Sequence, residues 1–78
     1  MKLQQLQVLI AVVDTGGIRA AARLLNLSQA AVTKSMKSLE DAAATPLLHR
    51  KARGVTLTEA GAKLLARAQK VSQTLGLD

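Results

Sequence analysis

The chain contains neither an aromatic residue nor a cysteine, although 49% of its 78 residues are apolar. Any hydrophobic core must therefore be built from aliphatic side chains and alanine, which let helices approach each other closely. A domain this short buries a modest share of its surface, and without cysteine it has neither disulfides nor thiolate metal ligands. His49 cannot form a metal site alone. We expect one small helical domain that needs no cofactor and gains stability from a partner subunit.

The charge of the chain indicates an anionic partner. Eleven Lys and Arg residues stand against five Asp and Glu residues, giving a net charge of +6. This balance is typical of proteins that bind nucleic acid or an anionic membrane surface, although a soluble protein can also simply be basic. The longest apolar stretch, residues 6–13, is too short to span a bilayer. The N-terminus lacks a signal-peptide pattern, so we expect a cytoplasmic location.

Two short helices are predicted at the start of the chain. In residues 3–13 apolar side chains recur at helical spacing, with glutamines on the other side. Gly16 can take the left-handed conformation that ends a helix. Residues 18–25 form the second helix, whose alanines allow close contact with another helix. Asn26 tolerates a left-handed backbone, and Ser28 is a good N-cap for the helix that follows.

The third predicted helix runs from about residue 29 to 42 and has two distinct faces. One stripe is suited to packing and consists of Val32, Ser35, Met36 and Leu39. The opposite side carries polar, cationic and small side chains, namely Ala30, Thr33, Lys34 and Lys37, with Gln29 at its N-terminal edge. Pro46 marks the stop, since it disfavours a helical residue before it.

Residues 47–57 change period and are predicted to form a β-hairpin. Short apolar segments flank a basic tip, and Gly54 can supply a positive φ there. The cations of the tip are Arg50, Lys51 and Arg53.

A final helix is predicted from residue 59 to about 75. Thr58 can cap its start, and Glu59 is favourable in its first turn. Its apolar seam is long for so small a domain and consists of Leu64, Ala68, Val71 and Leu75. Such a seam predicts contact with a partner helix.

Residues 18–37 have the pattern of a helix-turn-helix, and their free face suits the major groove of DNA. Base edges there offer donors, acceptors and the thymine methyl group. Gln29 can bond adenine, Thr33 offers a hydroxyl and a methyl group, Lys34 can reach guanine or a phosphate, and Ala30 can touch a thymine methyl. The free N–H groups beside Ser28 suit a phosphate. The alternative is an ordinary αα-hairpin whose polar face is solvated.

The basic hairpin strengthens this interpretation. Its cations could follow the phosphate backbone or enter the minor groove, where arginine is favoured. A solvated turn is the alternative. Together, the two features predict a mainly α fold, a winged helix-turn-helix with a three-helix core and a small wing.

Catalytic chemistry is not expected. His49 has no nearby His or carboxylate for metal binding or acid–base catalysis. Glu40 and Asp41 are adjacent in sequence and do not converge on one point, so we expect them to end a solvated helix. The glycines of residues 15–22 lack the preceding strand of a phosphate-binding loop. The chain is therefore not expected to be an enzyme.

The segments "LNLSQAAVTKSMKSLE" and "PLLHRKARGVTLTEAG" resemble the N-terminal domain of the LysR-type transcriptional regulators of bacteria. The similarity covers roughly residues 1–69. The matching residues are Ala21, Ala22, Ser28, Gln29, Leu39, Glu40, Pro46, Leu47, Arg50, Gly54, Leu57, Thr58, Ala60 and Gly61. The resemblance implies that residues 29, 30, 33 and 34 face the major groove. It also implies that Arg53 meets the minor groove or backbone, and that the last helix dimerises.

Several residues depart from the family pattern. Ala30 stands in place of the usual Pro, and Thr33 in place of Ser. Ile18 and Leu48 stand where aromatic residues are usual. Gly17 replaces a capping Ser, which should weaken the start of the second helix. These changes concern base preference rather than the fold.

The expected organisation is a DNA-binding domain over residues 1–58 and a linker and dimerisation helix over residues 59–78. The expected partners are double-stranded DNA with inverted-repeat half-sites and a second copy of the chain. The family also has a C-terminal effector-binding domain, which we do not expect within these 78 residues, so a small-molecule effector would act only through that domain. The alternative is a basic helical module that binds a protein or a membrane surface. Without aromatic residues, a membrane-binding helix is disfavoured.

Overall fold

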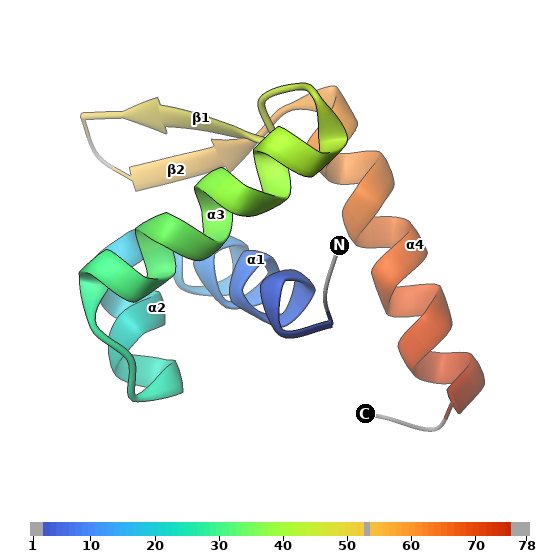
Figure 1. Ribbon diagram of the computed structural model, residues 1–78, viewed down its shortest axis with the longest axis horizontal. Coiled ribbons are helices and arrows are strands. Elements are labelled where there is room, and N and C mark those ends of the chain that lie inside the picture. Colours follow the sequence, from blue (N-terminus) through green and yellow to red (C-terminus); the bar gives the residue numbers. More distant parts are fainter. Residues whose placement is uncertain (1–2, 53, 76–78) are drawn as a thin grey trace.

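The computed structural model describes residues 3–52 and 54–75, with side chains described as far as residue 67. Three helices are followed by a two-stranded hairpin and a fourth helix (Figure 1). The elements are α1 (Leu3–Thr15), α2 (Ile18–Leu25), α3 (Gln29–Ala43), β1 (Leu48–Lys51), β2 (Gly54–Leu57) and α4 (Glu59–Leu75). The predicted winged helix-turn-helix fold is confirmed, and each helix boundary lies within a few residues of its predicted position.

The core lies where α1, α2 and α3 meet. Two alanines of α2, Ala21 and Ala22, are buried against α1 and α3, so small side chains hold the three helices close together. Leu47 and Leu48 extend this core towards the hairpin. The other buried hydrophobic residues are Val8, Leu9, Ala11, Val12, Val32, Met36 and Leu39. Their aliphatic character satisfies the constraint set by the absence of aromatic residues.

The turns on both sides of α2 depend on local chemistry that the sequence specifies. Gly16 has φ +82° and ends α1, and its amide donates to the Val12 carbonyl at 2.9 Å. Asn26 has φ 57° and ends α2. Ser28 then caps α3, because its hydroxyl accepts a bond from the Ala31 amide at 3.0 Å. All three predictions are confirmed, and Gly17 provides no side-chain cap for α2, as expected.

The end of α3 contains a feature that the sequence did not reveal. Helix α3 ends at Ala43, and Ala44 takes a left-handed conformation with φ 57°. The chain then turns back, so that Glu40 Oε2 accepts bonds from the amides of Leu47 at 2.7 Å and Leu48 at 3.3 Å. The expectation of a solvated Glu40 is therefore wrong. Its neighbour Asp41 is exposed, as expected.

The wing is tied to the rest of the domain at its base and near its tip. Strands β1 and β2 are antiparallel, with Leu48 opposite Leu57 and Lys51 opposite Gly54. At the base, the Thr58 amide donates to the Leu47 carbonyl at 3.1 Å. Towards the tip, the Val55 amide donates to the Gly16 carbonyl at 3.1 Å. The wing therefore lies against the turn between α1 and α2.

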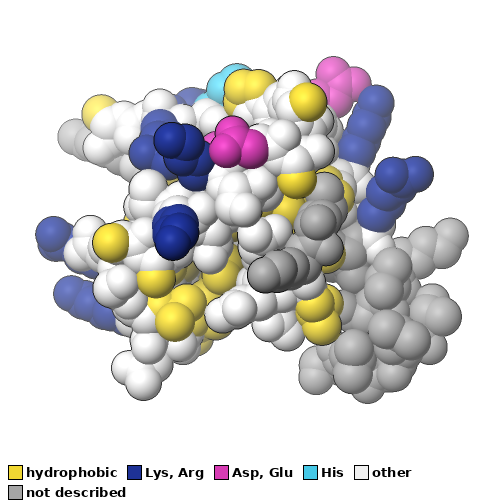
Figure 2. Space-filling model, viewed as in Figure 1, with side chains coloured by type: hydrophobic (Ala, Val, Ile, Leu, Met, Phe, Trp, Pro, Cys, Tyr) yellow, Lys and Arg dark blue, Asp and Glu magenta, His cyan; other side chains and the backbone are white. Residues whose placement is uncertain are grey.

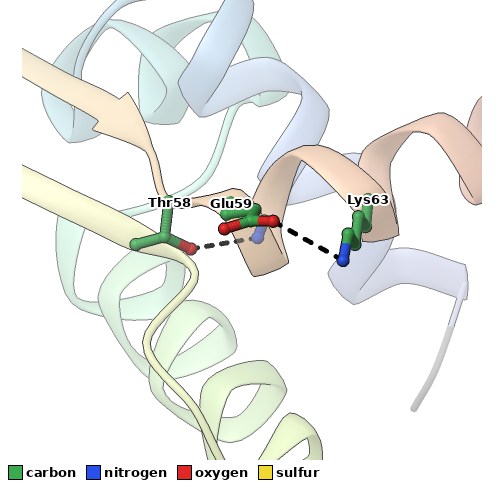
Figure 3. A network of polar contacts seen from close by, with 4 residues as sticks. Thr58, Glu59 and Lys63 are labelled. Atoms are coloured by element: carbon green, nitrogen blue, oxygen red, sulfur yellow. Dashed lines mark hydrogen bonds and ion pairs between the residues drawn. The ribbon is translucent and has the colours of Figure 1, made fainter.

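Helix α4 begins with the cap that the sequence predicts. The Thr58 hydroxyl accepts a bond from the Gly61 amide at 3.0 Å and donates to the Pro46 carbonyl at 2.8 Å. Glu59 and Lys63 form an exposed ion pair at 3.6 Å on the first turn (Figure 3). From there α4 extends away from α2 and the tip of the wing (Figure 1).

Candidate nucleic-acid interface

Helix α3 divides into a packing face and an exposed face, as its sequence predicts. Val32, Met36 and Leu39 are fully buried, and Ser35 is half-buried. The residues of the opposite side are all exposed and comprise Gln29, Ala30, Thr33, Lys34 and Lys37. The packing of α3 onto α1 and α2 therefore fixes which side chains α3 presents to a partner.

The N-terminal end of α3 adds hydrogen-bond donors to this surface. The first amides of a helix have no acceptor within the helix. Ser28 uses its hydroxyl to satisfy the amide of Ala31. The amides of Gln29 and Ala30 precede that capped position and lie at the exposed end of the helix. This end of α3 is therefore suited to a negatively charged group.

The wing contributes further exposed cations. Leu48 is buried, whereas the rest of strand β1, including Arg50 and Lys51, is exposed. Arg53 lies outside the described residues. Within residues 3–52 and 54–67, the cations of α3 and β1 form no ion pair with an acid. Basic side chains lie over α3 on the face that Figure 2 shows. This surface is therefore positive and not neutralised from within.

Two arginines of α2 belong to the same surface, although they were not among the residues predicted from the sequence to bind DNA. Arg19 and Arg23 are exposed and line a hollow of about 430 Å³ together with Asn26, Ser28 and Gln29. Their spacing of four residues places them on one side of α2, next to the buried alanines. The spacing could be read from the sequence as two cations on one side of a helix. Their position next to Gln29 depends on how α2 crosses α3.

The predicted dimerisation seam is described only at its start. Leu64 is half-buried and packs against the core of its own domain. It also lines a groove of about 680 Å³ between α4 and the connection from α3 to β1. The backbone of α4 continues to Leu75. The side chains of Ala68, Val71 and Leu75 lie outside the described residues, so their role stays a prediction.

The part of the chain that the structure describes has neither a metal-binding cluster nor a membrane-spanning helix. No three His, Asp or Glu side chains there are grouped to hold a metal ion. His49 is exposed on β1. None of the described helices is long and apolar enough to cross a membrane. The main candidate site is the basic surface of α2, α3 and the wing, where exposed cations gather.

Residues 3–62 match the family described as bacterial regulatory helix-turn-helix proteins of the LysR family. This chain belongs to the LysR family. The HTH-type transcriptional regulator CzcR of Bacillus cereus is 42% identical over 73 residues, which are 94% of this chain and 25% of that protein. The HTH-type transcriptional activator TtdR of Escherichia coli is 44% identical over 68 residues, 87% of this chain and 22% of that protein. The chain thus spans about a quarter of these LysR-family relatives.

Solved structures of LysR-type proteins share this fold. The CbnR_DBD–DNA complex superposes with a TM-score of 0.90 at 38% identity, covering 97% of this chain and 87% of that chain. The complex of BenM_DBD with benA site 1 DNA has a TM-score of 0.90 at 28% identity, covering 97% of this chain and 88% of that one. The chain is therefore a DNA-binding domain of a LysR-type transcription regulator.

Proposed function

We propose that this domain binds DNA sequence-specifically, with α3 in the major groove. The observation that supports this most strongly is the division of α3 into a buried apolar face and an exposed face of amide, hydroxyl and cationic groups. The major groove is wide enough to admit a helix, and each base pair shows a distinct pattern of donors and acceptors there. Gln29, Thr33 and Lys34 are the side chains we assign to base edges, with Ala30 against a thymine methyl group.

The remaining basic residues are assigned to the DNA backbone. Lys37 lies further along the exposed face of α3, and Arg50 and Lys51 lie on β1. Contacts with phosphates fix the orientation of a protein on the duplex without reading its sequence. With the wing tied to Gly16 by the Val55 amide, the basic strand keeps a fixed position relative to α3. Arg53 is assigned to the minor groove or the backbone.

A second copy of the chain would complete the binding unit. Ala68, Val71 and Leu75 continue the seam of α4 beyond Leu64 and are proposed to pack against the partner's α4. Two recognition helices related by a two-fold axis would read inverted half-sites, about one helical turn apart or a multiple of it. Binding by two linked modules also raises the overall affinity through effective concentration.

The proposed setting is the bacterial cytoplasm, where the DNA is. The chain corresponds to about a quarter of its curated relatives, so control of transcription and any response to a small-molecule effector would involve chain beyond this domain. No cofactor is proposed for the domain itself.

Removing the proposed base readers should relax the sequence preference. Selection from a randomised duplex pool should enrich one motif for the wild-type domain. Gln29→Ala or Lys34→Ala should then lose about 1–3 kcal/mol of discrimination at particular base positions, because a specific donor or acceptor is missing. Lys63→Ala removes an exposed cation of α4 and serves as the control. Equal weakening on every sequence would assign Gln29 and Lys34 to phosphates instead.

The dimer is tested by placing a charge in the proposed seam. Val71→Lys should shift the domain from dimer to monomer, because like charges would then face each other across an apolar contact, at a cost of several kcal/mol. Sedimentation equilibrium of both proteins at matched concentrations measures this change. A wild-type domain that remains monomeric at high micromolar concentration would refute the proposed seam.

A further inference from the structure

The hollow between α2 and the start of α3 is lined by positively charged side chains that have no role in the proposed contacts with base edges. It measures about 430 Å³ and is lined by Arg19, Arg23, Asn26, Ser28 and Gln29. Both arginines are exposed. Among the side chains that the structure describes, neither arginine forms an ion pair with an acid. The ion pair found among them joins Glu59 and Lys63.

The placement of the two arginines is unfavourable in the isolated domain. They are four residues apart on α2, so their side chains share one side of the helix. Like charges at this spacing repel each other and destabilise a helix by about 0.2–0.5 kcal/mol. An anion placed between the two guanidinium groups would remove this repulsion. Arginine also suits a phosphate chemically, because its planar fork of N–H donors matches two oxygens at once.

The position of the hollow identifies the source of the anion. Gln29 is both a lining residue of the hollow and the first residue of the helix assigned to the major groove. The walls of that groove are the two phosphate backbones. An arginine pair beside Gln29 therefore lies where a backbone phosphate passes when Gln29 reaches a base edge. Basic side chains occupy the left edge of Figure 2, where Figure 1 places α2 and the start of α3.

We infer that Arg19 and Arg23 together bind one phosphate of the DNA backbone at the edge of the half-site, in the hollow beside Gln29. This inference rests on the proposed entry of α3 into the major groove. The contact would anchor the helix-turn-helix beside the N-terminal end of α3, in addition to the backbone contacts proposed for the wing. It would contribute affinity and register but no base preference of its own, since a phosphate carries no sequence information.

The test compares two double variants that remove the same charge at the same helical spacing. Arg19→Ala with Arg23→Ala empties the hollow of cations. Lys63→Ala with Arg67→Ala removes two exposed cations of α4, which also lie four residues apart. Sedimentation and circular dichroism first establish that both variants keep the oligomeric state and helicity of the wild type. Affinity for the duplex selected by the wild type is then measured as a function of salt.

The arginine variant should lose one phosphate contact in each half-site. For the proposed dimer on two half-sites this lowers the slope of log affinity against log salt by about 1.8, which is about 0.9 for each phosphate. Its gain in affinity between about 200 and about 50 mM salt should then be about 12-fold smaller than that of the wild type. The α4 variant should keep the wild-type slope, and both should select the wild-type motif. An unchanged slope in the arginine variant would overturn the inference, as would an equal fall in both variants.

The same experiment separates this inference from the proposed function. If the wild-type domain enriches no motif from the pool, the proposed function itself fails. If the wild type enriches a motif and the arginine variant keeps its full salt slope, only the phosphate site is refuted. A changed motif in the arginine variant would also refute it, because the arginines would then contact bases. Arg19→Lys with Arg23→Lys should restore most of the slope, since the charge is kept.

Discussion

Replacing Gly61 with alanine should destabilise the domain by about 3 kcal/mol, at the upper end of what overpacking costs. Helix propensity alone predicts the opposite, a gain of about 1 kcal/mol. The packing decides, because a Cβ at this position would lie 2.2 Å from the Leu47 carbonyl oxygen and 2.9 Å from Leu57 Cδ2. The Leu47 carbonyl cannot easily move, since it accepts the bond from the Thr58 amide at the base of the wing.

Thermal unfolding followed by circular dichroism measures this effect. For a domain of this size, a loss of about 3 kcal/mol corresponds to a fall in Tm of roughly 12–24 °C. Gly17→Ala is the control, because a Cβ there meets no atom within 4 Å. That control should change stability by less than about 1 kcal/mol, through the weaker capping by alanine. A Gly61→Ala domain as stable as the wild type would show that α4 can shift away from Leu47.

Replacing Glu40 with alanine should cost a similar free energy of unfolding, about 3 kcal/mol. The carboxylate accepts bonds from the amides of both Leu47 and Leu48, two buried residues. A hydrogen bond to a charged group contributes about 1.5–3 kcal/mol, and the two donors would be left unsatisfied. Urea unfolding should show the loss as a lower midpoint. Because these amides begin the wing, DNA affinity should fall as well.

The residues around Glu40 provide matched comparisons. Glu40→Gln keeps a side-chain oxygen that can accept, so it should lose clearly less stability than Glu40→Ala. Asp41→Ala removes the adjacent carboxylate, which is exposed and has no side-chain bond to any residue in the described part of the chain. That variant should stay within about 0.5 kcal/mol of the wild type. Equal losses at positions 40 and 41 would exclude a specific role for the Glu40 bonds.

The candidate DNA surface could be predicted from the sequence only in part. The period of α3 assigned Gln29, Thr33 and Lys34 to its exposed side, because a helix repeats every 3.6 residues wherever it packs. The charge of the hairpin likewise predicted exposed cations on β1. Arg19 and Arg23 were missed, because their proximity to Gln29 depends on how α2 crosses α3. Period and charge describe one element at a time, whereas a surface is assembled from several.

The seam of α4 illustrates the same limit. Its apolar repeat predicted a helix with one apolar side, but it could not tell which surface that side contacts. Leu64, the first residue of the repeat, packs on the core of its own domain. An apolar repeat on a helix is therefore consistent with packing against a partner subunit and with packing against the chain's own core. Which of these contacts each residue makes depends on where α4 lies.

The sequence by itself determined where the elements begin and end, because those decisions are local. The bonds by which Gly16, Asn26, Ser28 and Thr58 end or cap a helix each reach a backbone group within five residues. Tertiary structure decided the bonds between elements: Glu40 with the start of the wing, and the Gly16 carbonyl with the Val55 amide. These bonds join groups that come together only when the helices pack. Their partners are set by the positions of whole elements, which no local pattern specifies.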